Sequence, residues 1–310
     1  MTTLTSPNGT PASSLCFGCM QFGGVADADD SRAMYDACRG AGVNFFDTAY
    51  LYTDGASETL LSGFVGAERE KLIIATKAGY TGGSGRENIM SQFATSQARL
   101  SIDAVDILYL HRWDPDTDLE ETFETLTELQ QSGRIRYIGV SNFAAWQVMK
   151  AQAVADRLGT RIDILQPMYS LVKRQAEVEI FPMALSEGMG IASYSPLGGG
   201  LLTGKYQSGG TGRLSSDERY AARYGQGWMH HTAEALSEVA ADMAMHPATL
   251  AVAWAAHHPA LTAPIISARN TDQLAPSLAA SDVTLSDEDY ERLESLSQRP
   301  APATDRLEES

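Results

Sequence analysis

The chain has 310 residues, of which 44% are hydrophobic and 20% are charged, and its formal net charge is −16. This apolar content excludes an intrinsically disordered protein and is enough for a large core. The acidic balance argues against a nucleic-acid-binding protein, which needs basic residues to neutralise phosphates, and against docking on an anionic membrane. We interpret the excess negative charge as a solvated surface.

Short apolar runs alternate along the chain with longer segments of helical periodicity. The predicted strands are residues 15–20, 44–49, 72–78, 106–111, 136–142, 164–170, 190–196 and 263–268. A strand–helix unit repeated about eight times is typical of a (β/α)8 TIM barrel, here a single domain over residues 1–310. A doubly wound sheet is the alternative, but to bind a dinucleotide it would need a Gly-rich turn that "CFGCMQFGGVAD" lacks.

Capping signals and apolar spacing locate several of the helices between these strands. In residues 27–42, Asp29 or Asp30 is the predicted N-cap, and Gly40 or Gly42 ends the helix. In residues 118–133, apolar side chains recur at helical spacing, and Gly133 ends the helix. These apolar residues are Leu119, Phe123, Leu126 and Leu129.

Further helices are predicted at residues 142–159, near 272–280, and at 285–297, where Ser286 is a plausible N-cap. The last of these is an extra C-terminal helix beyond the barrel repeat. Residues 1–12 and 299–310 are expected to be flexible tails.

Residues 198–230 interrupt the repeat with a Gly- and Arg-containing segment, predicted to be a long functional loop after strand 7. The stretch "GGLLTGKY" within it satisfies the P-loop pattern G-x-x-x-x-G-K. However, Tyr206 stands where a P-loop has the Ser or Thr that binds magnesium, and the motif does not open a βαβ unit. We therefore do not expect a nucleotide triphosphatase.

The three cysteines indicate a reducing compartment. They are too few for a disulfide framework. Cys16 and Cys19 lie three positions apart on a predicted strand and should point to opposite faces, so they form neither a redox pair nor a metal site. Residues 1–14 lack the features of a signal peptide, and no apolar run approaches the length of a membrane span. We expect a cytoplasmic protein with no metal, nucleic-acid or membrane partner.

Polar residues close the predicted strands at the end that faces the active site in a barrel of this kind. They are Asp47, Lys77, His111, Ser141, Asn142, Gln166 and Tyr194. A buried Asp or Lys is costly unless it is paired, so Asp47 and Lys77, on neighbouring strands, are the expected partners.

This set of side chains suggests a proton transfer coupled to hydride transfer. A lysine cation beside a tyrosine lowers the pKa of the phenol, which is ordinarily near ~10 and too high for an efficient acid. Asp47 would hold Lys77 charged, and His111 would orient a carbonyl oxygen through a ring N–H. Hydride cannot come from a side chain, so a nicotinamide cofactor is implied.

Motifs in the order found here resemble those of the aldo-keto reductases over residues 14–297. The matching stretches are "FGCMQFGG", "NFFDTAYLY", "IIATK", "DILYLHRWD", "GRIRYIGVSNF", "ILQPMYS", "SYSPLGGGLLTGKY" and "ARNTDQL". The resemblance implies NADP-dependent reduction of an aldehyde or ketone by a tetrad of Asp47, Tyr52, Lys77 and His111. Tyr52 would be the proton donor, and Tyr50 a packing residue or a minor wall.

The same resemblance implies a cofactor site. Ser141, Asn142 and Gln166 would bind the nicotinamide carboxamide, and Tyr194 would stack on its ring. The loop at Ser195, Leu197 and Gly198 would meet the pyrophosphate, and the 2′-phosphate would be held by Ser267, Arg269 and Gln273. NADPH is the expected cofactor, with NADH as the alternative, because Pro276-Ser277 and "ISAR" depart from the family pattern near the adenosine.

The substrate is less defined by the sequence. Candidate walls in the loops beyond the tetrad are Tyr80, Arg112, Trp113, Trp228, Arg219 and Arg223. Aromatic walls suit a hydrophobic or sugar-derived aldehyde, whereas Arg112 with an arginine of the insertion favours an anionic or polyhydroxylated one. The oligomeric state, the physiological substrate and the direction of the reaction are not indicated.

Two other functions compete with the reductase. A cofactor-binding regulatory protein resembling the potassium-channel β-subunits would show little turnover. A metal-dependent barrel hydrolase would use His111 and Asp114 as ligands, but the nearby charge of Lys77 disfavours a cation.

Overall fold

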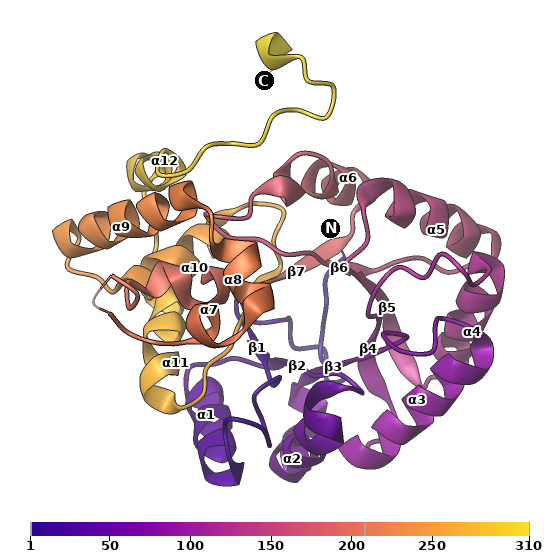
Figure 1. Cartoon of the computed structure of the whole chain (residues 1–310). Helices are drawn as coiled ribbons and strands as arrows, with labels where there is room; N and C mark the ends of the chain where they lie inside the picture. The colour runs from indigo at the N-terminus through magenta and orange to yellow at the C-terminus, as the bar shows by residue number, and fades with distance from the viewer. Residues whose placement is uncertain (1, 208, 310) are drawn as a thin grey trace.

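The computed structural model describes residues 2–207 and 209–309, and eight parallel strands in it close into one barrel (Figure 1). Each strand pairs with the next in sequence, and β8 pairs with β1. The strands are β1 (Cys16–Gly18), β2 (Phe45–Asp47), β3 (Ile73–Ala78), β4 (Val105–Leu110), β5 (Ile135–Ser141), β6 (Ile164–Gln166), β7 (Gly190–Tyr194) and β8 (Ala263–Ile266). The predicted (β/α)8 barrel and all eight of its strands are confirmed.

Helices connect the strands and cover the outside of the barrel (Figure 1). They are α1 (Ala28–Gly40), α2 (Ala56–Val65), α3 (Arg86–Leu100), α4 (Leu119–Gln131), α5 (Ala145–Arg157), α6 (Ile180–Glu187), α7 (Arg213–Ser216), α8 (Glu218–Tyr224), α9 (Gly227–Asp242), α10 (Pro247–His257), α11 (Thr271–Leu278) and α12 (Asp287–Glu294). None of the helices in the described residues is both long enough and apolar enough to cross a lipid bilayer.

Side-chain caps begin several of the helices, with one correction to the sequence prediction. The N-cap of α1 is Asp27, whose carboxylate accepts a hydrogen bond from the backbone N–H of Asp30 at 2.9 Å. Asp29 and Asp30 were predicted as caps, but they lie in the first turn, where their negative charge faces the positive end of the helix dipole. The Ser286 cap is confirmed, because its hydroxyl accepts from the backbone N–H of Asp289 at 3.1 Å.

Alternate strand residues fill the interior of the barrel, as a two-residue side-chain period requires. Among them are Cys16, Phe45, Ile73, Ile107, Tyr109, Ile164 and Ala192. Gly139 is required by this packing, since a Cβ on it would lie 2.3 Å from the ring of Tyr109. Cys16 belongs to this interior, whereas Cys19 packs in the outer core, so the two thiols face opposite sides as predicted.

The two ends of the chain lie differently against the barrel. Residues 2–12, treated as a tail in the sequence, carry a buried Leu4 that packs against the barrel interior. The backbone N–H of Thr5 donates to the Tyr137 hydroxyl at 3.2 Å, near the start of β5, so this segment covers the lower end of the barrel. The first residues after α12 still pack on the body, where Thr232 donates to the Leu296 carbonyl at 3.0 Å, and the described residues beyond Arg299 extend away from it (Figure 1).

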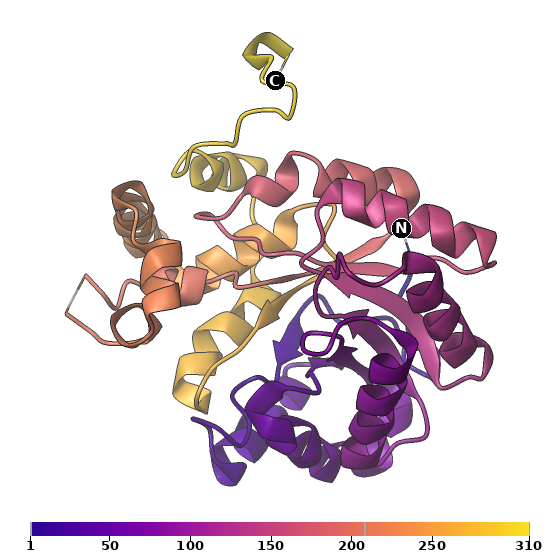
Figure 2. The same ribbon diagram turned by 45° about the vertical axis from the view of Figure 1, so that its right-hand side comes forward.

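The segment predicted as a long loop after strand 7 folds into short helices. The 3₁₀ turn η4 (Gly198–Thr203) begins it, α7 and α8 follow, and α9 starts within its last residues. It protrudes from the barrel on one side, in orange in Figure 2. Contacts of η4 with α7 and α8 hold the segment together, and contacts of η4 with α9 and α10 tie it to the body of the protein.

Candidate active site

Most polar residues of the site lie two positions beyond a residue of the barrel interior, along the same strand or just past its end. Asp47 lies two positions beyond interior Phe45, and Lys77 two beyond Ala75. The same offset of two positions holds for five more residues: His111 after Tyr109, Ser141 after Gly139, Gln166 after Ile164, Tyr194 after Ala192, and Ser267 after Ile265. Because side chains two apart on a strand share a face, the fold directs the whole set to the upper end of the barrel.

Asp47 and Lys77 form the buried ion pair that the sequence predicts. Lys77 Nζ donates to Asp47 Oδ2 at 2.5 Å and to the main-chain oxygen of Thr48 at 2.7 Å. The side chains of Lys77 and Asp47 are 0% and 4% exposed. Gln166 Nε2 donates to the other carboxylate oxygen at 2.9 Å. The pair is therefore desolvated, and both carboxylate oxygens accept hydrogen bonds.

Tyr52 is delivered to this pair by the turn after β2. The backbone N–H groups of Thr48 and Tyr50 donate to Ala75 and Lys77 carbonyls, so the turn follows the edge of β3. The 3₁₀ turn η1 (Tyr52–Gly55) then begins, and the Nζ of Lys77 lies 4.7 Å from the centroid of the Tyr52 ring. The next residue, Thr53, has a φ of 48° and is held by a hydrogen bond to the Phe22 carbonyl at 2.7 Å.

The electrostatics of Tyr52 correct one expectation. Burial raises the pKa of Tyr52, and the opposing effect of Lys77 does not overcome it, so the phenol is not made more acidic overall. Burial also lowers the pKa of Lys77, but Asp47 and Tyr52 raise it by more, and the lysine keeps its charge. Tyr52 is thus a protonated phenol beside a cation that can stabilise a phenolate.

His111 adds a neutral imidazole to the same place. Burial, together with the charges of Lys77 and Arg112, lowers the pKa of His111 to about 3. Its ring lies edge-on to Tyr52 and to Tyr80, with centroids 5.8 and 5.0 Å away. Nδ1 is buried without a hydrogen-bond partner among the described residues. A proton on Nδ1 would be a buried N–H donor with no acceptor, so we assign the proton to Nε2. Nε2 can then donate a hydrogen bond to an oxygen in the cavity.

A group of amide and hydroxyl side chains lies beside the tetrad. Asn142 Nδ2 donates to the His111 carbonyl at 2.9 Å, and the Tyr194 hydroxyl donates to Asn142 Oδ1 at 2.7 Å. Ser141 Oγ donates to the Gln166 carbonyl at 3.0 Å. Asn142 and Ser195 both have positive φ angles, of 59° and 61°. Such strain in residues other than glycine is common at functional sites, and here both residues line the same cavity.

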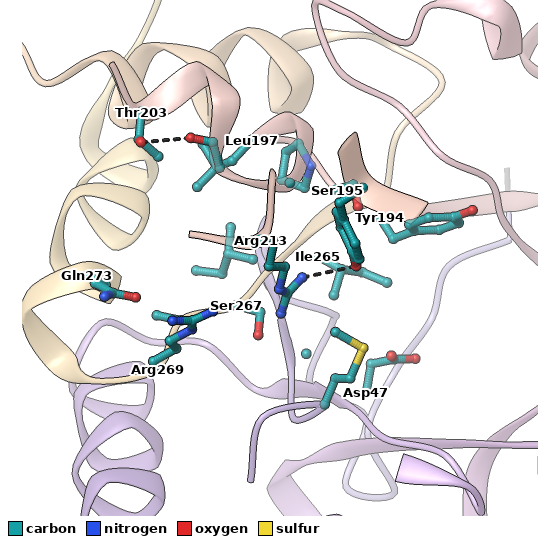
Figure 3. A pocket seen from close by; sticks show the side chains of 18 of the residues that line it. Asp47, Tyr194, Ser195, Leu197, Thr203, Arg213, Ile265, Ser267, Arg269 and Gln273 are labelled. Atoms are coloured by element: carbon teal, nitrogen blue, oxygen red, sulfur yellow. Dashed lines mark hydrogen bonds between the residues drawn. The ribbon is translucent and has the colours of Figure 1, made fainter. Parts of the chain in front are cut away.

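One cavity of about 850 Å³ contains these groups. Asp47, Tyr52 and His111 line it, whereas Lys77 lies beneath the surface, behind Asp47. At the other end of the cavity lie Arg269 and Gln273, far from Asp47 and Tyr194 in Figure 3. A volume of this size holds an extended ligand.

The end at Arg269 is suited to an anionic group. Lys205 lines the cavity there together with Ser267 and Arg269, and Arg213 lies between this end and the other. All three cations line one cavity, and burial together with the charges of Arg269 and Arg213 lowers the pKa of Lys205. The hydroxyl oxygen of Ser267 is buried with no hydrogen-bond partner among the described residues. An unpaired hydroxyl beside clustered cations fits a phosphate oxygen.

The structure brings together most of the residues predicted for the site. Asp47, Tyr52 and His111 line the cavity, and Lys77 lies directly behind Asp47. The predicted cofactor residues also line it, except Gly198, whose neighbours Gly199 and Gly200 do so in its place. A Cβ on Gly199 would lie 2.8 Å from the ring of Tyr220. Only glycine fits there, with φ at 66°.

Only some of the predicted substrate residues line the cavity. Tyr80, Arg112 and Arg223 line the cavity. Trp113 instead packs edge-on against Phe143 and Trp146. Trp228 does not line the cavity; it is 44% exposed, and its ring N–H donates to Gln226. Arg219 also lies outside the lining and pairs with Asp217 at 3.0 Å.

Sequence reasoning missed several lining residues in the insertion, namely Thr203, Lys205, Arg213 and Tyr220. Two of them belong to "GGLLTGKY", which was considered as a P-loop and as part of a family-like stretch, but without a role for Thr203 or Lys205. The available signal was its place after strand 7, where barrels often bind phosphate. In the described residues, no group of three or more His, Cys, Asp or Glu side chains is arranged to hold a metal ion.

A closed parallel barrel carrying this tetrad and a cationic end is the arrangement of a nicotinamide-dependent barrel oxidoreductase. The chain belongs to the aldo/keto reductase family, whose profile matches residues 14–298.

Curated relatives carry both reductase and channel names. A protein of Homo sapiens named aflatoxin B1 aldehyde reductase member 4 is 34% identical over 86% of this chain and 87% of its own length. The uncharacterized oxidoreductase YrpG of Bacillus subtilis (strain 168) is 32% identical over 96% and 95%. A probable voltage-gated potassium channel subunit beta of Oryza sativa subsp. japonica is 31% identical over 96% and 97%. Family membership supports carbonyl reduction with a nicotinamide cofactor in general terms.

Proposed function

We propose that this protein reduces an aldehyde or ketone to an alcohol with NADPH, and that Tyr52 donates the proton. The observation that carries the proposal is the position of Lys77. Its ammonium group lies 2.5 Å from a carboxylate oxygen of Asp47 and 4.7 Å from the ring centroid of Tyr52. A phenol beside a fixed, desolvated cation can lose its proton at a developing alkoxide, because the cation stabilises the phenolate that remains.

Each residue of the tetrad has a separate task in this reaction. When bound, the reduced nicotinamide supplies a hydride to the carbonyl carbon. Tyr52 gives its phenolic proton to the carbonyl oxygen, and Lys77 stabilises the resulting phenolate. Neutral His111 donates a hydrogen bond to the same oxygen, which stabilises the charge that develops there. Asp47 orients Lys77, and a proton from solvent restores Tyr52.

The rest of the cavity suits the cofactor. Ser141, Asn142 and Gln166 would bind the carboxamide, and Tyr194 would lie against the nicotinamide ring. Ser195, Leu197 and the glycines after them would meet the pyrophosphate, while Ser267, Arg269 and Gln273 would meet the adenosine end. We favour NADPH over NADH because the unpaired Ser267 hydroxyl lies with clustered cations, which an additional phosphate would neutralise.

The test is NADPH oxidation, followed spectrophotometrically, against a panel of aldehydes and ketones. We expect turnover with at least part of the panel and much weaker activity with NADH. The relatives named as channel subunits motivate the second candidate, a cofactor-binding regulatory protein with little turnover. Tight NADPH binding, seen as quenching of tryptophan fluorescence, combined with no turnover on any carbonyl would favour that second function.

A further inference from the structure

The arginines of this chain divide into those that pair with an acid and those that do not. Most have a carboxylate oxygen within 4.0 Å of a guanidinium nitrogen. Among the residues that the structure describes, the exceptions are Arg112, Arg134, Arg213, Arg223 and Arg269.

Four of these five arginines line the active-site cavity. The fifth, Arg134, donates to the side-chain oxygen of Gln97 instead. Acidic side chains are abundant in a chain of net charge −16, so an arginine without one is unusual here. A cavity that collects guanidinium groups without carboxylate partners is arranged to receive anions.

The four cavity arginines are spread along the cavity. Arg269 lies at the end considered above for the cofactor phosphate, and Arg213 lies between the two ends, where it donates to the Tyr220 hydroxyl at 3.2 Å. Arg112 directly follows His111 in sequence, and its charge contributes to the low pKa of that imidazole. Burial raises the pKa of Tyr194 to about 12, and Arg223 is the main charge that opposes this shift. Contacts between side chains place Arg112 and Arg223 toward the reacting end of the cavity. The centroid of the Tyr80 ring, over which Arg112 lies, is 5.0 Å from that of the His111 ring. Tyr224, next to Arg223, contacts the sulfur of Met168, whose backbone pairs with Tyr194.

Aromatic rings support both of these arginines. The guanidinium carbon of Arg112 lies 4.8 Å from the ring centroid of Tyr80, and that of Arg223 lies 5.5 Å from that of Tyr220. Both tyrosines also line the cavity. A guanidinium whose face rests on a ring is held in place while its N–H edges stay available for an oxyanion.

The acid nearest in sequence to Arg112 does not neutralise it. Asp114 forms no ion pair within 4.0 Å of any described residue, and its oxygens accept from Ser84 N, Thr117 Oγ1 and Asp116 N. Burial raises the pKa of Asp114, but these hydrogen bonds and the charge of Arg112 hold it below its usual value. Asp114 thus shapes its own loop, and the edges of Arg112 remain for a ligand.

We propose that Arg112 and Arg223 determine specificity by binding an anionic group of the substrate. The preferred substrates are then aldehydes or ketones that carry a carboxylate or phosphate a few bonds from the carbonyl. This inference rests on the proposed reductase function, since it places the carbonyl at Tyr52 and His111. It adds that charge, rather than apolar contact alone, selects the substrate.

A matched pair of substrates isolates the charge. 4-Carboxybenzaldehyde and methyl 4-formylbenzoate have the same ring and the same position of the aldehyde, but only the first is an anion. We expect kcat/KM to be about fivefold or more higher for the acid than for the ester at low salt. This is the size of effect that charge-assisted hydrogen bonds give at a partly exposed site. Screening should lower this preference at ~0.5 M salt. Glyceraldehyde 3-phosphate against glyceraldehyde provides the phosphate arm.

Arg112→Gln and Arg223→Gln remove one charge each and keep a polar side chain. Each should lower the acid-to-ester preference by about threefold to fivefold, chiefly through KM for the acid, with a smaller effect on the ester. Arg219→Gln is the matched control, because Arg219 is on α8 with Arg223 but pairs with Asp217 outside the cavity. It should leave the preference as in the unaltered protein.

The possible results separate this inference from the function on which it rests. Reduction of the ester with no preference for the acid, or a preference that both variants keep, overturns the inference and leaves the reductase intact. No reduction of any substrate overturns the proposed function, and the inference with it. Equal losses on acid and ester in Arg223→Gln, with a matching rise in the dissociation constant for NADPH, would assign Arg223 to the cofactor and overturn its role here.

Discussion

Lys77 and Asp47 come from neighbouring strands and meet at 2.5 Å between Nζ and Oδ2, with almost none of either side chain exposed to solvent. Such a pair is not a simple gain in stability, because both ions have lost their hydration. Its value lies in geometry: the carboxylate fixes the ammonium 4.7 Å from the ring of Tyr52. The two charges therefore depend on each other for burial, and Tyr52 depends on Lys77 for its chemistry.

Removing one member of this pair should destabilise the protein more than removing both. Lys77→Met leaves a buried carboxylate without its cation and should cost about 3–5 kcal/mol in the free energy of unfolding. Asp47→Asn combined with Lys77→Met removes both charges and should recover much of that loss without restoring turnover. Urea denaturation at pH 7 measures both effects. A single variant as stable as the unaltered protein would contradict the desolvated pair.

The two tyrosines of "NFFDTAYLY" should respond very differently to loss of the hydroxyl group. Tyr52→Phe should lower kcat by about 10²–10⁴-fold, the usual contribution of a general acid, with little change in NADPH affinity. Tyr50 does not line the cavity, and its ring packs under Arg99, with 4.9 Å from the guanidinium carbon to the ring centroid. Tyr50→Phe is therefore the control and should retain most of the activity. Similar losses in both would refute the choice of Tyr52.

The local period of the strands explains why so much of the site could be read from the sequence. Asp47 and Lys77 lie at the ends of apolar strands and His111 directly follows one, and each lies two positions beyond an interior residue. Their place in the fold is therefore fixed by a short stretch of chain and by the direction of a parallel barrel. The same argument applies to Gln166 and Tyr194.

What the sequence could not provide depends on distant parts of the chain. The direction of the Tyr52 pKa shift results from burial by the surrounding elements, which outweighs the lysine seen in the motif. The insertion carries Lys205 and Arg213 into the cavity, but it has no periodicity that predicts how it folds back. Capping of α1 by Asp27 rather than Asp29 or Asp30 is a choice between neighbouring acids that composition does not distinguish.

The pKa values of His111 and Tyr52 predict the pH dependence of carbonyl reduction. The pKa of His111 is lowered to about 3, so its neutral form persists throughout the range from pH 5 to 8. Tyr52 is active as the protonated acid, and its pKa is raised, so activity is retained below that pKa and lost as the pH rises through it. We expect kcat at saturating NADPH to be flat from pH 5 to 8 and to fall only in alkali. A loss of activity centred near pH 6.5 would show that His111 titrates in its ordinary range.

The cationic end of the cavity should distinguish NADPH from NADH. Arg269→Gln removes a charge that lies with Lys205 and the unpaired Ser267 hydroxyl. It should raise the dissociation constant for NADPH by about tenfold, the loss expected for a charge-assisted contact with phosphate, and change that for NADH little. Fluorescence titration with the two cofactors measures this directly, and NADH serves as the internal control because it lacks only the 2′-phosphate. Since the contact is ionic, the preference for NADPH should also decrease with salt. Equal weakening of both cofactors would mean that Arg269 contacts a part of the dinucleotide that they share.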